Sequence, residues 1–322
     1  MEKKDLKIVY MGTPDFAVEP LKTLVENGYN IVGVITMPDK PAGRGHKIQY
    51  SPVKEYAMAN NLRLLQPEKL KDEEFIEELK SLNADLQIVV AFRMLPEVVW
   101  GMPKLGTFNL HASLLPQYRG AAPINWAIIN GEKETGITTF FLTHEIDTGK
   151  IIQQEKIEIK ETDNVGIIHD KLMYKGSELV VETVEAILNG TIHPKPQEEL
   201  YSSEADLKAA PKIFKETCKI DFSKSKEEIY NLIRGLSPYP AAWAELSTDK
   251  GPLVIKIYET EKIDKAHQLP MGIVETDGKK TFDVAVKDGF IRIKALQLQG
   301  KKRLSTEEFL KGFRPTEGMK FM

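Results

Sequence analysis

Three polar residues stand where apolar segments of the sequence end, and their side chains could carry out acid–base chemistry together. Asn109 and His111 lie two positions apart in FNLHASLLP (108–116), so a strand would place them on one face. Asp147 closely follows the apolar run GITTFFLT (136–143). Strand ends of open α/β sheets form ligand sites, so the three groups could meet at one site. Each is also an ordinary residue for a strand end or a turn.

The other motifs and reactive side chains of the sequence do not indicate a protease site, a dinucleotide site or a metal site. Asp-Thr-Gly (147–149) is the tripeptide of aspartic proteases, but it occurs once and such a protease needs two opposed carboxylates. Gly12 stands alone where a dinucleotide-binding turn would need several glycines. Cys218 is the only cysteine, which excludes an internal disulfide and a cysteine-based zinc site. The six histidines show no ligand spacing, so we expect no metal.

The first half of the chain alternates predicted strands and helices, as the positioning of such a site requires. Short apolar strands separated by helices predict a Rossmann-like α/β domain with a mainly parallel sheet covered on both faces. The expected strands are 6–12, 30–36, 86–92, 106–113, 136–143 and 151–159. The expected helices are 16–28, 52–60, 73–82, 123–131 and about 165–188.

The second half has a different pattern, which predicts a second domain. Residues 191–210 lose the periodicity and are rich in proline, so we expect a linker between a domain at 1–190 and one at 211–322. A helix is expected at 226–236. Short strands separated by Gly, Asp and Lys then predict a small all-β domain, an OB-like barrel, with strands at 252–260, 271–276, 282–288 and 290–299.

The composition is that of a globular protein with more than one core. The 322 residues are 42% hydrophobic and 28% charged, and this length favours two domains. The apolar run before Gly12 is too short for a signal peptide, and no segment has the length of a membrane span. We therefore expect a cytoplasmic protein without a membrane partner.

Positive charge is concentrated in two places. Residues 211–322 hold 21 Lys and Arg against 16 Asp and Glu, a net charge of +5, whereas residues 1–210 have a net charge of −8. The long loop predicted at 37–54 is also basic, with Lys40, Arg44 and Lys47. Such residues suit phosphate contacts, although a solvated surface has the same composition.

Together these motifs resemble the formyltransferase family that uses 10-formyltetrahydrofolate. Asn109-x-His111 is followed by SLLP (113–116), RGAAP (119–123) and Asp147-Thr-Gly, as in that family. The match is strongest with members that formylate methionyl-initiator-tRNA, because further segments fit them in order: MGTPDFA (11–17), PDKPAGRG (38–45), SPVK (51–54), IVVAF (88–92), KIDFSKS (219–225) and LSPYPAAW (236–243). There are three departures: Ala112 replaces a glycine, Gln117 replaces a common basic residue, and AFRMLP (91–96) is one residue short.

The resemblance implies roles for individual residues. Asn109 and His111 would donate hydrogen bonds to the oxygen that gains charge during formyl transfer, and Asp147 would support His111 and help accept the amine proton. The folate would be held by Ser113, Leu114, Leu115 and Pro116, with Phe92, Arg93, Met94 and Leu95 on the pterin side. The tRNA would contact Lys40, Arg44, Lys47, Lys301, Lys302 and Arg303.

Other readings of the same residues stay open. Relatives with the same Asn-His-Asp set formylate a nucleotide sugar or a purine precursor, or hydrolyse the folate. The basic loop and the basic β domain favour the tRNA substrate over these. A protein that only binds nucleic acid or folate is a further alternative, but it would leave the aligned catalytic groups without a use.

Overall fold

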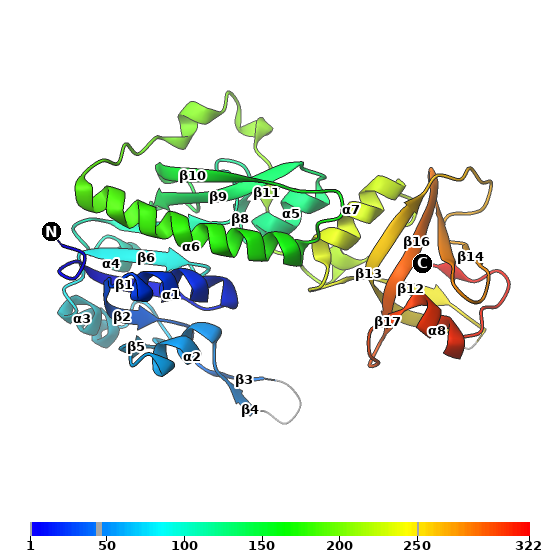
Figure 1. The fold of residues 1–322 in the computed structure, drawn as a ribbon, viewed down its shortest axis with the longest axis horizontal. Helices are drawn as coiled ribbons and strands as arrows, with labels where there is room; N and C mark the ends of the chain where they lie inside the picture. Colours follow the sequence, from blue (N-terminus) through cyan, green and yellow to red (C-terminus); the bar gives the residue numbers. More distant parts are fainter. Residues whose placement is uncertain (1, 43–46, 250) are drawn as a thin grey trace. The chain divides into compact units, whose positions relative to one another are not determined.

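The computed structural model describes residues 2–42, 47–249 and 251–322, which form two compact units (Figure 1). Unit 1 comprises residues 1–120, 135–157 and 169–209, and unit 2 comprises residues 121–134, 158–168 and 210–322. Two segments of the first half of the chain thus belong with its last third. The domain limits proposed from the sequence, 1–190, 191–210 and 211–322, stay a prediction.

Unit 1 is built on a mainly parallel sheet, as predicted (Figure 1). The strand order is β10-β9-β7-β6-β1-β2-β5, in which β9 runs antiparallel to β7 and the pairs from β7 to β5 are parallel. The strands are β1 (Lys7–Gly12), β2 (Asn30–Ile35), β5 (Leu64–Leu65), β6 (Leu86–Val90), β7 (Thr107–His111), β9 (Glu134–Phe141) and β10 (Ile151–Glu158).

Helices cover both faces of this sheet because its strands are apolar on both sides. On one face Val9 and Val89 pack with Phe75 of α3 (Glu73–Ser81). On the other face Leu110 of β7 meets Gly176 of α6 (Val165–Asn189), where a Cβ atom would lie 2.7 Å from the leucine side chain. The other helices in this part of the chain are η1 (Asp15–Ala17), α1 (Val18–Glu26), α2 (Pro52–Ala59), α4 (Glu97–Trp100), η2 (Gln197–Leu200) and η3 (Glu204–Asp206).

The predicted loop 37–54 contains a short hairpin that the sequence did not predict. Strands β3 (Lys40–Ala42) and β4 (Lys47–Gln49) pair antiparallel. Strands of three residues are too short for an alternation of apolar and polar residues to be recognised in the sequence. Arg44 lies outside the described residues.

Unit 2 contains an antiparallel sheet that almost closes into a barrel, in agreement with the predicted small all-β domain (Figure 1). The order is β14-β15-β16-β13-β12-β18, and Ile273 beside β14 bridges to Lys320 of β18, which joins the two edges. The strands are β12 (Ala242–Ser247), β13 (Leu253–Ile263), β14 (Val274–Thr276), β15 (Phe282–Val286), β16 (Gly289–Leu298), β17 (Leu304–Ser305) and β18 (Lys320–Phe321). β12 and β18 were not predicted from the sequence.

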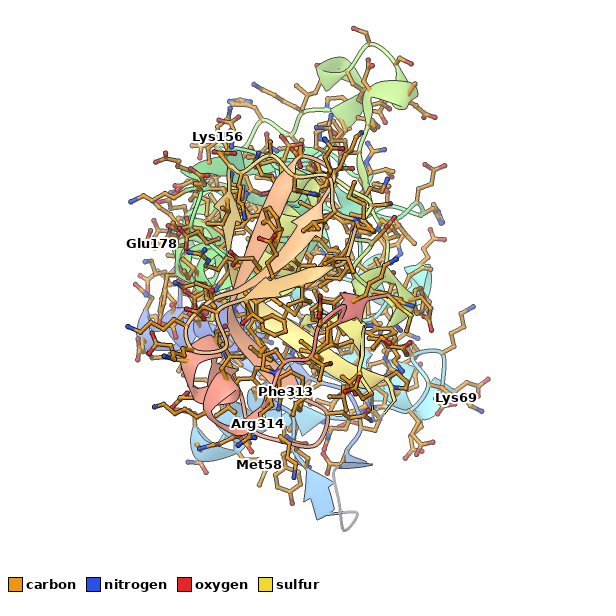
Figure 2. The ribbon with its side chains drawn as sticks, turned by 90° about the vertical axis from the view of Figure 1, so that its right-hand side faces the viewer. Met58, Lys69, Lys156, Glu178, Phe313 and Arg314 are labelled. Atoms are coloured by element: carbon orange, nitrogen blue, oxygen red, sulfur yellow. The ribbon has the colours of Figure 1, made fainter. Side chains whose placement is uncertain are left out.

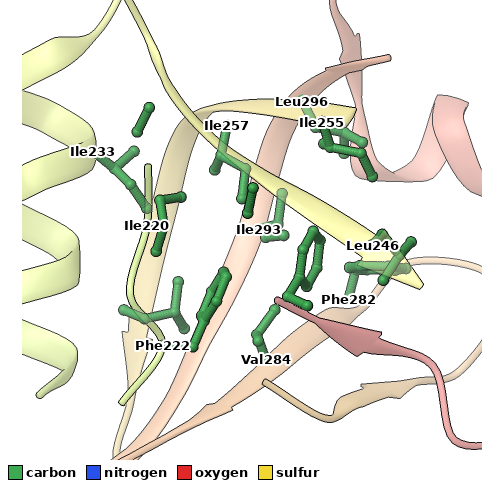
Figure 3. Packing of buried hydrophobic residues seen from close by; sticks show 14 of the residues in the cluster. Ile220, Phe222, Ile233, Leu246, Ile255, Ile257, Phe282, Val284, Ile293 and Leu296 are labelled. Carbon is green, nitrogen blue, oxygen red and sulfur yellow. The ribbon is translucent and has the colours of Figure 1, made fainter. Parts of the chain in front are cut away.

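Alternating apolar residues fill the inside of this sheet (Figure 3). The ring of Phe282 is fully buried, and its centroid lies 5.9 Å from that of Phe309 and 6.3 Å from that of Phe321. Phe309 belongs to α8 (Thr306–Gly312), which caps the core, and Phe313 at the end of this helix stacks on Phe309 (Figure 2). Two strands and one helix therefore share one aromatic cluster.

Helix α7 (Lys226–Leu236) has the predicted limits because both of its ends are marked in the sequence. Ser225 and Glu228 form a capping box at its first turn. The helix packs on α5 (Pro123–Ile129), where a Cβ atom at Gly235 would lie 2.6 Å from Ile129. Asn125 also donates a hydrogen bond of 2.8 Å to the Gly235 carbonyl. These contacts explain why residues 121–134 belong to unit 2.

Two further features of the described chain concern membrane spans and metal sites. Among its helices, none is both long enough and apolar enough to cross a membrane. Within residues 2–42, 47–249 and 251–322, no three His, Cys, Asp or Glu side chains gather where they could hold a metal ion. The remaining short elements are β8 (Arg119–Gly120), β11 (Ala209–Ala210) and η4 (Glu216–Cys218).

The aromatic cluster of unit 2 yields a test of the fold. We expect Phe282→Ala to lower the free energy of unfolding by about 3–5 kcal/mol, because the substitution leaves a cavity between two rings that cannot move together. Chemical denaturation followed by tryptophan fluorescence measures this. Phe214→Ala is the matched control, since that ring is 58% exposed and its loss leaves no cavity. Equal destabilisation by the two variants would contradict the assigned core.

Candidate active site

Strand β7 brings Asn109 and His111 to one face of the sheet at its carboxyl end, as the spacing predicts. Asn109 lies opposite Phe140 and His111 opposite Thr138 on the neighbouring strand β9. The ring of Phe140 meets the His111 ring edge to face at 6.4 Å. Only 7% of His111 is exposed, so the imidazole is held in a largely desolvated position.

The two nitrogens of His111 have different partners. Nε2 lies 2.9 Å from the carbonyl oxygen of Tyr118, and because a carbonyl only accepts, Nε2 carries the hydrogen of this bond. Nδ1 faces Oδ2 of Asp147 at 3.9 Å, which is too long for a direct hydrogen bond. The nitrogen left for chemistry is therefore Nδ1, next to a carboxylate.

Asp147 is held at this distance by the backbone around it. Its Oδ2 accepts a hydrogen bond of 2.9 Å from the Gly120 amide. The residue has φ of 56°, in the left-handed region that asparagine and aspartate tolerate best. At Gly149 a Cβ atom would lie 1.6 Å from the Phe141 carbonyl oxygen, so only glycine fits there. The tight turn that presents the carboxylate thus depends on the Asp-Thr-Gly sequence.

Gln197 braces the same turn from a distant part of the chain. Its side-chain amide is fully buried and donates bonds of 2.8 Å to the carbonyls of Asp147 and Gly149. Its oxygen accepts two hydrogen bonds from Arg119, at 3.0 and 2.7 Å. Every polar atom of the buried amide is therefore paired. Through Gln197 the Asp147 turn is also connected to Arg119, whose neighbours Tyr118 and Gly120 contact His111 and Asp147.

Asn109 stands out because part of its side chain has no partner. Its Oδ1 atom is buried and makes no hydrogen bond within the described residues, and the same holds for Oγ1 of Thr13 just beyond β1. Buried polar atoms are nearly always paired in proteins, so an unpaired pair of oxygens at the carboxyl edge of one sheet marks a place for a polar ligand. Thr13 was not predicted as a site residue.

The residues expected to hold the folate differ in accessibility. Ser113, Leu115 and Pro116 are buried, and Leu115 packs with Phe140 in a small core. The Ser113 hydroxyl donates to the Gln117 carbonyl at 2.7 Å. Leu114 is half-buried. Side-chain contact with a ligand is thus open to Leu114, whereas the other three shape the backbone.

The residues after β6 that were expected to contact the folate also differ in accessibility. Leu95 is buried and Met94 is 69% exposed, while Phe92 is half-buried. Arg93 turns back to the chain, where it donates hydrogen bonds to the carbonyls of Pro67 and Glu68. Burial lowers the pKa of its guanidinium below the ordinary value. Arg93 therefore fixes this segment, and Phe92 and Met94 are the side chains free to meet a ligand.

The residues expected to contact tRNA belong to both units. Lys40 and Lys47 lie in β3 and β4. Lys301, Lys302 and Arg303 are exposed on the turn between β16 and β17. Arg303 lies 4.5 Å above the Tyr258 ring and 3.9 Å from a Glu259 carboxylate oxygen.

Sequence reasoning missed the residues that orient the site. Tyr118, Arg119 and Gly120 act through the carbonyl, guanidinium and amide described above. Arg119 and Gly120 begin the RGAAP segment noted in the sequence, whereas Tyr118 lies just before it. Gln197 fell in the predicted linker and carried no signal at all. A buried glutamine is recognisable only once the loop that covers it is known.

The chain is similar to known proteins over nearly its whole length. The family described as "Formyl transferase" matches residues 6–184, and the family described as "Formyl transferase, C-terminal domain" matches residues 212–314. The chain is 68% identical to the methionyl-tRNA formyltransferase of Bacteroides thetaiotaomicron over 99% of each chain. It is 58% identical to that of Flavobacterium johnsoniae over 97% of each.

Solved structures share the fold at lower identity. An N-formyltransferase from Helicobacter canadensis, in complex with folinic acid and dTDP-3-aminofucose, superposes with a TM-score of 0.64 at 23% identity. The match covers 93% of this chain and 100% of that one. HypX from Aquifex aeolicus, in complex with tetrahydrofolic acid, has a TM-score of 0.63 at 16% identity over 98% of this chain and 50% of the other.

The brace on the Asp147 turn yields a prediction. We expect Gln197→Ala to speed amide hydrogen exchange in residues 143–150 about tenfold or more, because each lost bond to a buried carbonyl costs about 1–3 kcal/mol. Mass spectrometry of peptic fragments measures it. Gln66→Ala is the matched control, since Gln66 also donates two side-chain bonds but to Met37 and Asp39. Unchanged exchange at 143–150 in Gln197→Ala would show that the turn holds itself.

Proposed function

The chain belongs to the formyl transferase family, and we propose that it transfers the formyl group of 10-formyltetrahydrofolate to the free amino group of methionyl-initiator-tRNA. Formylmethionyl-tRNA for translation initiation is the product. Near full-length identity of 55–68% to methionyl-tRNA formyltransferases is the observation that carries the proposal. The grouping of Asn109, His111 and Asp147 at one sheet edge supports it.

The site suits a folate donor that presents a formyl group. When bound, 10-formyltetrahydrofolate supplies an activated formamide whose oxygen gains negative charge as the amine attacks. The unpaired Oδ1 of Asn109 and Oγ1 of Thr13 fit a ligand with polar groups at this edge. The half-buried Phe92 and Leu114 and the exposed Met94 offer apolar surface for its ring system.

Asn109 is proposed to serve both reacting groups through its carboxamide. Its NH2 group donates to the formyl oxygen, where a preorganised donor is worth most because charge develops there. Its Oδ1 accepts a hydrogen bond from the attacking amine. The amide is suited to this double role because it holds a donor and an acceptor side by side in one rigid plane.

His111 and Asp147 are proposed to accept the proton that the amine must lose. Since Nε2 of His111 donates to Tyr118, the proton goes to Nδ1, on the side of the carboxylate. Asp147 at 3.9 Å stabilises the imidazolium that forms. This refines the role expected from the sequence, in which an N–H of His111 would donate to the oxyanion. As the bond between the formyl carbon and N10 of the folate breaks, the imidazolium returns this proton to N10, so that tetrahydrofolate leaves as a neutral amine. No nucleophilic side chain is required, because the donor is already activated.

The tRNA is proposed to approach through basic residues of both units. The candidates are Lys40, Arg44, Lys47, Lys301, Lys302 and Arg303. The net charge of +5 on residues 211–322 favours a polyanion, whereas residues 1–210 at −8 would repel it. We therefore assign most of the affinity for tRNA to residues 211–322.

The activity is tested directly by transfer of labelled formyl groups from 10-formyltetrahydrofolate. The acceptors are methionyl-initiator-tRNA, methionyl-elongator-tRNA, an amino sugar nucleotide and methionine amide. We expect efficient transfer to the initiator alone. Preferred transfer to the amino sugar nucleotide would overturn the proposed substrate.

We expect Asn109→Ala and His111→Ala each to lower the turnover number about a hundredfold or more, as the loss of one donor or base does. Single-turnover transfer to methionyl-tRNA measures the chemical step. Circular dichroism of the variants is the control for folding, because His111 packs on Phe140. Turnover close to wild type in either variant would refute its catalytic role.

Asp147→Asn separates charge from shape at the same position. The amide fits the turn, but the negative charge beside Nδ1 of His111 is lost, so we expect a large fall in turnover and an altered pH–rate profile. Steady-state rates across the pH range measure both. Asp170→Asn, at an exposed residue of α6, is the matched control. A profile that overlays wild type at full activity would make Asp147 a structural residue.

A further inference from the structure

Unit 2 carries a pocket that the formyl-transfer site does not use. Its volume is about 600 Å³, and Phe214, Tyr239 and Trp243 contribute the large side chains of its lining. The floor is apolar and includes Val254 of β13 and Leu298 of β16. A volume of this size is enough for a ring-containing ligand.

The aromatic side chains of the pocket are unusually exposed. Tyr239 is 81% exposed and Phe214 is 58% exposed, although apolar rings of this size normally bury most of their surface. Trp243 is half-buried, and its indole N–H donates to the Lys215 carbonyl at 2.9 Å, which fixes the ring. The pocket therefore presents the exposed rings of Tyr239 and Phe214 beside a Trp243 ring that is fixed against the core.

Lysines surround the same rings without acidic partners. Lys215 and Lys219 hold their ammonium groups 5.3 and 5.6 Å from the Trp243 ring centroid, and Lys212 lies 5.6 Å from that of Phe214. Lys256 donates to the Pro240 carbonyl at 3.2 Å. Within the described chain none of the four forms an ion pair.

Two other lysines of unit 2, by contrast, form ion pairs with carboxylates. Lys262 lies 2.7 Å from a Glu161 carboxylate oxygen and 2.6 Å from one of Glu227, and Lys226 lies 2.6 Å from Asp264. Their charges are neutralised on the surface. The charges around Phe214 and Trp243 remain available to an anionic partner.

We propose that this pocket binds an unpaired nucleobase of the RNA substrate, a proposal that rests on the proposed function. The base stacks on the ring faces, and the lysines contact the phosphates on either side. Exposed aromatic rings combined with unpaired cations are the means by which proteins bind single-stranded nucleic acid. The exposed side chain of Gln299 on the rim can pair with the edge of the base.

A paired helix does not fit this site, because its bases are stacked inside the duplex and present only edges and phosphates. An acidic peptide would satisfy the lysines but would leave the ring faces without a flat partner. The observations thus favour a flipped or looped-out base over both. A nucleobase that is held here fixes the tRNA at a second point besides its aminoacyl end.

The test is the binding of a fluorescein-labelled single-stranded RNA octamer and of the same sequence as a blunt duplex, with the full-length protein. Tyr239→Ala and Phe214→Ala are expected to weaken binding of the single strand about tenfold or more and to leave the duplex unaffected. Tyr239→Phe keeps the ring and should bind as wild type. Unchanged single-strand binding in both alanine variants, or equal losses for both RNA forms, would overturn the proposal.

Charge is tested by a matched pair of lysine variants. Lys215→Ala should reduce the slope of log affinity against log salt concentration by about 0.7, the value for one contact to a single-stranded phosphate. Lys279→Ala removes an equal charge from the turn between β14 and β15, which does not line the pocket, and should leave the slope unchanged. Equal slopes for the two variants would contradict a role of the lysines at the pocket.

Kinetics separate this proposal from the proposed function. If the wild-type protein formylates methionyl-tRNA, Tyr239→Ala should raise the KM for that substrate about tenfold. A wild-type KM in this variant would refute the pocket and leave the function intact. If the wild-type protein transfers no formyl group to methionyl-tRNA, the proposed function fails, and the octamer experiment still decides whether the pocket binds single-stranded RNA.

Discussion

The hydrogen bonds that join His111 and Asp147 to the backbone of residues 118–120 are the constraint on which the candidate site depends. The Tyr118 carbonyl determines which imidazole nitrogen carries hydrogen, and the Gly120 amide holds the carboxylate near the other nitrogen. Tyr118 has φ of 61°, which strains a residue with a side chain, whereas Gly120 adopts φ of 126° without a Cβ atom in the way. One piece of backbone thus sets the orientation of two titratable side chains, one at the end of strand β7 and one in the turn between β9 and β10.

A strained segment of this kind persists only where its surroundings hold it. The Tyr118 amide donates to the Lys208 carbonyl at 2.6 Å, and Arg119 binds Gln197. Gln197 in turn holds the Asp147 turn through two carbonyls. The irregular residues 197–208 therefore act as a scaffold for the site, although their composition is that of a linker. This closed set of bonds explains how a turn with φ of 56° at Asp147 can be maintained.

Unit 2 combines a rigid barrel with an uneven charge distribution. Hydrogen bonds from Phe321 to Gly272 and from Val274 to Met319 join the two edges of its sheet, so the loops at its surface stand on a fixed base. Lysines on part of that surface are paired with carboxylates, whereas those around Trp243 are not. A stable β platform that displays aromatic rings and cations suits a nucleic acid with unstacked bases and charged phosphates.

The sequence by itself determined the alternation of strands and helices, the small β domain, and the shared face of Asn109 and His111, because these follow from local periodicity and from Gly, Pro and capping residues. The sequence also placed Asp147 after a predicted strand, and the motif resemblance added its role and the folate donor. Only the tertiary structure decided that Nε2 of His111 is bonded to Tyr118 and that Gln197 braces the Asp147 turn. It also decided that residues 121–134 pack with α7, and that the lysines around Trp243 form no ion pair within the described residues. These contacts join residues far apart in the chain, and no local pattern encodes which distant groups meet.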